Sequence, residues 1–334
     1  MPLEEPSNLQ TLFQQEEYFL GVFENEHYKV TRKYIETVGI LQRLYYTRLD
    51  PLKQITKASL VMIHGFGEHS SRFLDFAEAF VQVGYSVHLV DLRGYGYSGG
   101  ARGVSLMEEM MRDVEVCMKQ ADENLPLFVF GHSMGGLLVL SLGCRNPNLK
   151  IAGFISSSAL LGDPGDRKIE QFKKDGTNLI GDFLGDILIN GMINVTSLTK
   201  NNRSLKGIID DPHNIPFFSL KMAKSLLNTI DIIQPSAKYF NYPILLYHGQ
   251  RDCITNYKDS IRFFNKIKSQ DKKIQLFQTG YHEMHHEEKE GSEIEKMVVQ
   301  WLDQRYKDGV KFSKDFTIST QIPHIITKQL EQIS

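Results

Sequence analysis

The sequence is poor in three features: cysteine, net charge and long apolar runs. Its three cysteines, Cys117, Cys144 and Cys253, lack the number and spacing of a disulfide framework, which predicts reduced thiols in an intracellular compartment. The formal net charge of -2 offers no clustered positive field for phosphates, so we expect no nucleic-acid partner. No run is long enough to span a bilayer, and residues 1–6 lack the basic start and apolar stretch of a signal peptide. We therefore expect an intracellular protein, either cytoplasmic or peripheral on a membrane.

The composition is that of a globular chain, with 41% hydrophobic and 23% charged side chains among 334 residues. This length fits one α/β domain that carries an insertion. We predict an N-terminal extension over residues 1–25, a core over 26–159 and 238–306, an inserted cap over 160–237, and a C-terminal tail over 307–334. The extension and the tail are candidate segments for docking to protein partners, which the sequence does not identify.

Short apolar runs alternate with helical patterns along most of the chain. Residues 27–35 and 40–48 alternate apolar and polar side chains, which predicts an antiparallel hairpin at a sheet edge. Buried strands are predicted at 58–64, 85–90, 127–130, 151–156, 244–248 and 274–277. Helices are predicted at 71–82 and 257–267, and after capping boxes at Ser105 with Glu108 and Ser292 with Glu295. This alternation predicts an α/β fold with a mostly parallel sheet and helices on both faces.

Two further helices are predicted outside this alternation. One is a short helix at about 12–18 in the extension, and the other covers 180–188 in the insertion, where apolar residues recur at helical spacing. Gly181 and Gly185 weaken the second helix.

The apolar run from residue 127 leads directly into Gly131-His132-Ser133-Met134-Gly135, which matches Gly-x-Ser-x-Gly and precedes a helical stretch. A serine hydroxyl is a weak nucleophile, so it must be exposed on a sharp turn beside a base and amide donors. Gly131 and Gly135 are needed because side chains would collide across such a turn. The pattern therefore predicts that Ser133 is a catalytic nucleophile.

A base and an orienting acid follow the serine in the expected order. Asp252 comes after the strand at 244–248, and His282 comes after the strand at 274–277. Because the carboxyl ends of parallel strands share one sheet edge, Ser133, Asp252 and His282 should meet there as a catalytic triad. The amides of Phe66, after an early strand, and Met134, after the nucleophile, are the predicted oxyanion donors.

Two other motif matches are weaker. Residues 94–99 satisfy Gly-x-Gly-x-x-Gly, but no helix begins directly after them, so a bound pyrophosphate would meet no helix dipole. Residues 282–286 satisfy His-Glu-x-x-His, a zinc-protease pattern that requires a helix, yet glycines flank the segment on both sides. We expect no metal, and we expect His285 and His286 to lie at the surface or behind the site.

The sequence resembles the monoacylglycerol lipase branch of the α/β-hydrolase superfamily. The resemblance is carried by the segments 64–72, 91–98 and 131–136, together with Asp252 and Tyr281-His282. It implies an α/β-hydrolase fold, the triad and oxyanion residues predicted above, and no cofactor. It further implies that Glu68, Arg72 and His132 lie near the polar end of the pocket, where a glycerol head binds. The insertion would match the family's cap, which guides a lipid chain and can rest on a membrane surface.

These observations predict a serine hydrolase that cleaves carboxylic esters through an acyl-serine intermediate. A monoacylglycerol or a lysophospholipid is the expected substrate, because the cap offers an apolar surface beside a small polar pocket. The alternative is a hydrolase fold that serves as a structural or interaction subunit with little or no catalysis, because a fold does not fix a function.

Overall fold

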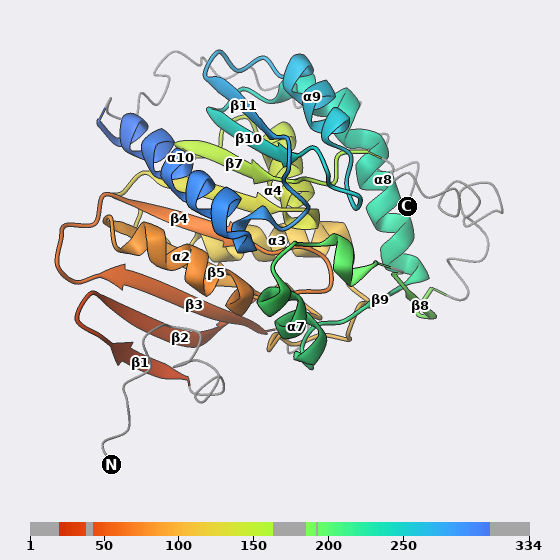
Figure 1. Ribbon diagram of the computed structural model, residues 1–334, viewed down its shortest axis with the longest axis horizontal. Coiled ribbons are helices and arrows are strands. Elements are labelled where there is room, and N and C mark those ends of the chain that lie inside the picture. The colour runs from red at the N-terminus through yellow and green to blue at the C-terminus, as the bar shows by residue number, and fades with distance from the viewer. Residues whose placement is uncertain (1–19, 38–42, 163–184, 192, 308–334) are drawn as a thin grey trace.

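A nine-stranded sheet forms the centre of the computed structural model, which describes residues 20–37, 43–162, 185–191 and 193–307 (Figure 1). The spatial order of the strands is β1-β2-β3-β5-β4-β6-β7-β10-β11. Their bounds are β1 Gly21–Glu24, β2 Tyr28–Glu36, β3 Arg43–Pro51, β4 Ala58–Ile63, β5 Tyr85–Val90, β6 Leu127–His132, β7 Gly153–Ser157, β10 Ile244–Gly249 and β11 Lys272–Phe277. The strands from β5 to β11 pair in parallel, whereas β1, β2 and β3 pair antiparallel. The predicted mostly parallel sheet is therefore confirmed.

Helices cover both faces of this sheet. The helices α2 (Leu74–Val81) and α10 (Glu288–Lys307) pack on one face. On the other face lie α3 (Met107–Met118), α4 (Met134–Arg145), α8 (Leu220–Ser236) and α9 (Tyr257–Lys266) (Figure 1). The central strands β4, β5 and β10 are buried along their whole length, since both of their faces meet helices.

The sheet begins earlier than the sequence indicated. Strand β1 pairs antiparallel with β2, and Val22 lies opposite Thr31. Residues 21–24 therefore belong to the sheet, and the expectation of an extension reaching residue 25 is corrected. The helix predicted at 12–18, the centre of the hairpin turn at 38–42 and the tail beyond residue 307 lie outside the described residues.

Both predicted capping boxes are wrong. Helix α3 begins one residue late, with Leu106 at its N-cap, and the Glu109 carboxylate accepts the Leu106 amide at 3.0 Å. The Ser105 hydroxyl donates instead to the carbonyl of Arg93 at 2.8 Å. Helix α10 begins at Glu288, so Ser292 lies inside it.

The insertion has its own small structure and also contributes to the core. Strands β8 (Leu188–Asn190) and β9 (Phe217–Ser219) pair antiparallel, and α7 (Asn202–Asp210) lies between them in the chain. Most of the helix predicted at 180–188 lies outside the described residues, and Leu188 is in a strand. Helix α8 packs against α4 and buries Met222, Ile230 and Ile233 in the same core cluster. The predicted cap thus ends in a helix that is part of the core.

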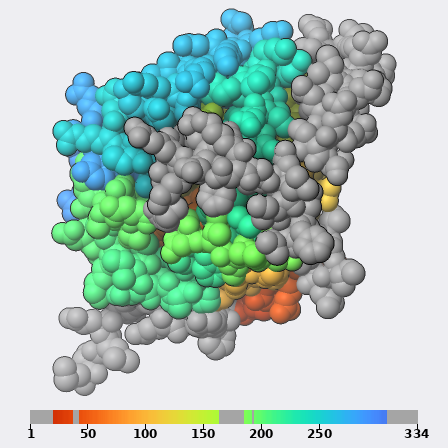
Figure 2. Space-filling view, turned by 90° about the vertical axis from the view of Figure 1, so that its right-hand side faces the viewer, coloured from red at the N-terminus to blue at the C-terminus, as the bar shows by residue number. Residues whose placement is uncertain are grey.

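Four short 3-10 turns complete the described structure: η1 (Ser70–Phe73), η2 (Val195–Ser197), η3 (Ala237–Tyr239) and η4 (Met284–His286). The first and last of these flank the site described next. The face formed by the insertion is turned toward the viewer in Figure 2, where its described residues are green.

Candidate active site

Ser133 sits on the sharp turn between β6 and α4. Its φ of 54° and ψ of -116° are rare for a residue with a side chain. A Cβ at Gly131 would lie 2.4 Å from the Gly135 carbonyl oxygen, and one at Gly135 would lie 2.4 Å from the backbone oxygens of Ile63 and His64. The two glycines are therefore required by the close approach of the backbone, as the sequence pattern predicted.

His282 lies between Ser133 and Asp252. Its Nε2 is 2.9 Å from the Ser133 hydroxyl oxygen, and its Nδ1 is 2.7 Å from Asp252 Oδ2. Because a carboxylate only accepts, Nδ1 carries the hydrogen, and the Nε2 lone pair faces the serine hydroxyl. Burial disfavours the imidazolium, but the charge and hydrogen bond of Asp252 outweigh burial and raise the pKa of His282 above 6.5. The structure thus brings the three predicted residues into one hydrogen-bonded line, in the order that the predicted nucleophile, base and acid require.

The Asp252 carboxylate is held by its own loop. Its Oδ1 accepts the amides of Ile254 at 2.7 Å and Thr255 at 2.9 Å, and its Oδ2 accepts the Thr255 hydroxyl at 2.8 Å. Burial opposes ionisation, but the charge on His282 and the hydrogen bonds from His248 and His282 dominate and lower the pKa of Asp252. Asp252 is therefore an anion at neutral pH.

The predicted oxyanion donors both lie near the serine. Met134 is the first residue of α4, directly after Ser133, and Phe66 lines the same cavity as Ser133. A Cβ at Gly65 would be 3.1 Å from the Ser133 Cβ, so the backbone before Phe66 passes close to Ser133. The Gly65 amide donates to Glu68 at 2.6 Å, which fixes this loop.

A buried ion cluster adjoins the triad. Arg72 donates to Glu68 at 3.0 Å and, through two nitrogens, to Glu283 at 3.1 and 2.6 Å. Burial and the Glu283 charge raise the pKa of Glu68 against the opposing effect of Arg72. Burial opposes ionisation of Glu283 as well, but Arg72 outweighs it and lowers the pKa of Glu283. The charges of this cluster therefore act on His282.

One neutral histidine packs against His282, and a second packs against the first. The His132 ring centroid is 4.8 Å from that of His282, and its Nδ1 is 3.2 Å from the Ser157 hydroxyl. His285 is buried and stacks on Phe73, with ring centroids 4.8 Å apart. Burial lowers the pKa of both His132 and His285, so both are uncharged at neutral pH. Of the two positions expected for His285, the structure shows the one behind the site, where aromatic rings enclose it.

The triad opens into a cavity of about 330 Å³. Ser133, His282, Glu68, Arg72 and His132 line it together with apolar side chains that come mainly from the insertion. The apolar lining residues are Phe66, Ile193, Val195, Leu198, Ile208, Ile209, Ile215, Pro216 and Ile254. The cavity can therefore receive a ligand that is apolar in one part and polar in another.

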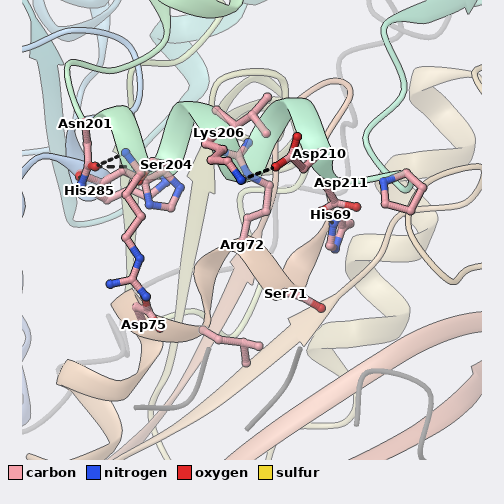
Figure 3. Close-up of a pocket in the computed structure, with 16 residues that line it drawn as sticks. His69, Ser71, Arg72, Asp75, Asn201, Ser204, Lys206, Asp210, Asp211 and His285 are labelled. Carbon is pink, nitrogen blue, oxygen red and sulfur yellow. Dashed lines mark hydrogen bonds and ion pairs between the residues drawn. The ribbon is translucent and has the colours of Figure 1, made fainter. Parts of the chain in front are cut away.

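A second cavity, of about 540 Å³, lies beside the first and is lined mostly by polar side chains (Figure 3). The two cavities share Arg72, Ile208 and Asp211 as lining residues. Asp211 is 2.7 Å from the Nε2 of His69, which joins the insertion to the loop that follows Phe66. Arg72 and Asp211 thus form part of the wall between the two cavities.

The two competing motif matches have other roles in the structure. The Gly94 amide donates to the Gly99 carbonyl within a turn, and the next helix begins only at Met107. In the His-Glu-x-x-His match, His282 contacts Ser133 and Asp252, and only a short 3-10 turn follows. Over the described ranges, no group of three or more metal-ligating side chains is arranged to hold an ion. No helix in the described part of the chain is long and apolar enough to cross a bilayer.

Sequence reasoning missed several residues of the site. Glu283 stood in the zinc-like pattern, so its pairing with Arg72 was not considered. Thr255 and His248 support Asp252 from short polar segments without a recognisable pattern. The one available signal for His248 was its place at the end of the strand before Asp252.

Known proteins resemble this chain in sequence and in structure. The human monoglyceride lipase is 28% identical over 256 residues, which covers 75% of this chain and 83% of that protein. An abhydrolase domain-containing protein of Dictyostelium discoideum is 31% identical over 85% of this chain, although the chain spans only 30% of that relative. The crystal structure of the monoacylglycerol lipase of Paleococcus ferrophilus superposes with a TM-score of 0.71 at 28% identity, covering 78% of this chain and 99% of that one.

The fold, with helices on both faces of a mostly parallel sheet, is the α/β-hydrolase fold of these similar proteins. The sequence model of one hydrolase family, described as serine aminopeptidase, S33, matches residues 54–289. That match includes Ser133, Asp252 and His282 and covers more than half of the sequence, and the chain therefore belongs to this family.

Proposed function

We propose that the chain is a serine hydrolase that cleaves carboxylic esters of lipids, with a monoacylglycerol or a lysophospholipid as substrate. The observation that carries this proposal is the hydrogen-bonded line from Ser133 through His282 to Asp252, with separations of 2.9 and 2.7 Å. The similarity to the human and Paleococcus ferrophilus lipases supports the ester-hydrolase class. A fold without catalysis is not favoured, because a structural subunit would not require this line of side chains.

The proposed reaction has two stages. In acylation, the Ser133 oxygen attacks the ester carbonyl while His282 Nε2 takes the hydroxyl proton, and Asp252 holds the imidazolium. The amides of Phe66 and Met134 stabilise the tetrahedral oxyanion. The intermediate then collapses, the bond to the alcohol breaks, and His282 gives its proton to the leaving oxygen. In deacylation, His282 takes a proton from water, which attacks the acyl carbon. The bond between that carbon and the Ser133 oxygen then breaks, His282 returns the proton to the serine oxygen, and the fatty acid is released.

The cavity supports a lipid rather than a small polar ester. Glu68, Arg72 and His132 are proposed to face the alcohol part of the substrate, since they line the cavity beside Ser133. The apolar residues of the insertion are proposed to face the acyl chain, because burying each methylene contributes about 0.8 kcal/mol. We propose no cofactor, because the steps above need only protein groups and water.

The outer surface of the insertion supports transient contact with a membrane. Ile187, Leu188 and Ile209 are large apolar side chains that are 48%, 47% and 69% exposed. Side chains of this kind bind to the boundary between head groups and acyl chains. We propose that this surface meets a lipid layer when substrate is taken up. We also propose that residues 1–19 and 308–334, which lie outside the described residues, dock to protein partners.

We also propose a division into a core and an inserted cap, for which the sequence predicted the bounds 160–237. The small sheet of β8 and β9 and the helix α7 support a separate cap, because they lie outside the central sheet. The contacts of α8 favour placing the end of the cap before residue 220.

Labelling with a fluorophosphonate probe tests the hydrolase proposal. The folded protein should be labelled, and the label should vanish in Ser133→Ala. Ser141→Ala is the matched control, because Ser141 is also buried but lies within α4, away from the turn. Failure of folded protein to be labelled contradicts the proposal.

Substrate comparison tests the lipid part. We expect turnover of long-chain monoacylglycerol or lysophosphatidylcholine, and release of fatty acid is the measurement. Turnover of short nitrophenyl esters without any long-chain lipid contradicts the lipid part and leaves the hydrolase part standing. Turnover of aminoacyl amides alone contradicts the ester specificity.

A further inference from the structure

A second histidine contacts the carboxylate of the triad. His248 is in β10, four residues before Asp252, and its side chain is completely buried. Its Nε2 is 3.1 Å from Asp252 Oδ2, the same oxygen that His282 contacts. On the other side of the ring, Nδ1 is 2.8 Å from the hydroxyl oxygen of Ser260 in α9.

The surrounding groups determine which nitrogen of His248 carries a hydrogen. Nε2 faces three oxygens, those of the Asp252 carboxylate at 3.1 Å, the Thr255 hydroxyl at 3.1 Å and the Thr255 carbonyl at 3.3 Å. The carboxylate and the carbonyl only accept, and the hydroxyl, which donates its hydrogen to Asp252, accepts as well. Nε2 must therefore be the donor. In the neutral ring, Nδ1 then accepts from the Ser260 hydroxyl, which has a free hydrogen for this purpose. A continuous line of hydrogen bonds thus runs from Ser260 through His248 to Asp252.

The position of this line gives it a specific effect on the reaction. Oδ2 accepts from His282 at 2.7 Å, from Thr255 at 2.8 Å and from His248 at 3.1 Å. A carboxylate oxygen that accepts a further N–H is held in one orientation, and less of its negative charge acts on each donor. His248 therefore influences both where Oδ2 points and how strongly it attracts His282.

We propose that His248 is a positioning residue that holds the Asp252 carboxylate toward His282 and moderates the charge that His282 meets. The inference rests on the proposed function, because it assigns a role within the same hydrolytic site. His248 touches neither Ser133 nor the cavity, so it acts through its contacts with Asp252 and Thr255.

The direction of the effect on pH dependence follows from charge. Without the His248 donor, Oδ2 carries more negative charge toward His282, which stabilises the imidazolium and raises the pKa of His282. Activity requires neutral His282. The acidic limb of the pH profile, where kcat/KM falls as His282 becomes protonated, therefore moves to higher pH. The other ionisable groups that act on His282 remain in place in such a variant; they are Glu68, Glu283, His132 and His285.

The test compares His248→Phe with His248→Gln, both normalised to active sites by fluorophosphonate titration. Phenylalanine keeps the ring and removes the donor, whereas glutamine retains an N–H. For His248→Phe we expect kcat to fall about tenfold with KM unchanged, and the acidic limb to rise by about 0.5 to 1 pH unit. His248→Gln should restore most of both. His88→Phe is the matched control, because His88 is equally buried and hydrogen-bonded but lies in β5, where it contacts Tyr46 of β3 and Ser86.

An unmoved acidic limb in His248→Phe overturns the proposal, as does an equal loss of kcat in the phenylalanine and glutamine variants. Should His248→Phe fail to fold, Ser260→Ala tests the same line of hydrogen bonds: a small upward movement of the limb supports the proposal, and an unmoved limb overturns it. Labelling that persists in Ser133→Ala would instead refute the proposed function itself, so the two failures are distinguishable.

Discussion

Replacing Ser133 by glycine should give a more stable protein than replacing it by alanine. Both variants lack the nucleophile and its hydrogen bond to His282, so they differ only in the Cβ. With φ at 54° and ψ at -116°, a residue that has a Cβ is strained by about 1 to 3 kcal/mol, and glycine is not. Glycine loses about 0.5 to 1 kcal/mol more in chain entropy on folding. The net advantage of Ser133→Gly is therefore about 1 kcal/mol.

Thermal unfolding of the two inactive variants measures this difference. At about 2 cal/mol/K of unfolding entropy per residue, 1 kcal/mol corresponds to about 1 to 2 °C in Tm for a chain of 334 residues, so Ser133→Gly should melt higher by about that amount. The same pair of changes at Ser141 is the control, because it lies in the regular part of α4, where alanine is favoured by about 1 kcal/mol. If Ser133→Gly melts at or below the temperature of Ser133→Ala, the turn is not strained and the reasoning fails.

Three other outcomes are expected. The acidic limb of kcat/KM should have its midpoint above pH 6.5, because the pKa of His282 is raised; a midpoint below 6.5 contradicts this. Gly67→Ala should lower kcat/KM for ester hydrolysis about tenfold, because φ at Gly67 is 78° and the new Cβ would lie 2.8 Å from the backbone oxygen of Ile215 in the insertion. Gly207→Ala should leave kcat/KM unchanged, because nothing lies within 4 Å of a Cβ there, and an equal loss in both variants would contradict this prediction. Asp211→Asn should destabilise the protein by about 1 kcal/mol at pH 6 and less at pH 9. The pKa of His69 is raised in the folded state, so the contact between His69 and Asp211 stabilises the protein fully below pH 6.5, and this stabilisation is lost as the pH rises through the raised pKa. If Asp211→Asn lowers Tm equally at pH 6 and pH 9, the stability of the contact does not depend on the charge of His69.

The parts of the fold that were predicted from sequence are those with strong local signals. The strand 85–90 was predicted with its observed bounds, because a buried parallel strand is a short apolar run. Ser133, Asp252 and His282 could be expected together because each follows a parallel strand, and the carboxyl ends of such strands share one edge. Local pattern and topology were sufficient for these features.

Other features depend on contacts between distant segments, which no local pattern encodes. The start of α3 is set partly by Ser225 of α8, whose hydroxyl accepts the Met107 amide at 3.0 Å, so the capping box at Ser105 was misleading. The pairing of Arg72 with Glu283 joins residues 211 positions apart. Strand β1 was missed because four residues at a sheet edge, half of them exposed, bury too little apolar surface to produce a recognisable run.

Helix α8 determines which part of the insertion can be exchanged. It places apolar side chains against α4, and its Gln234 amide donates to the carbonyls of Leu161 and Asp259 at 3.0 Å each. A chimaera that receives another hydrolase's cap up to residue 237 would lose these contacts along with the cap. The exchange should therefore end at Ser219, so that substrate preference is transferred while the supporting helix of the host remains.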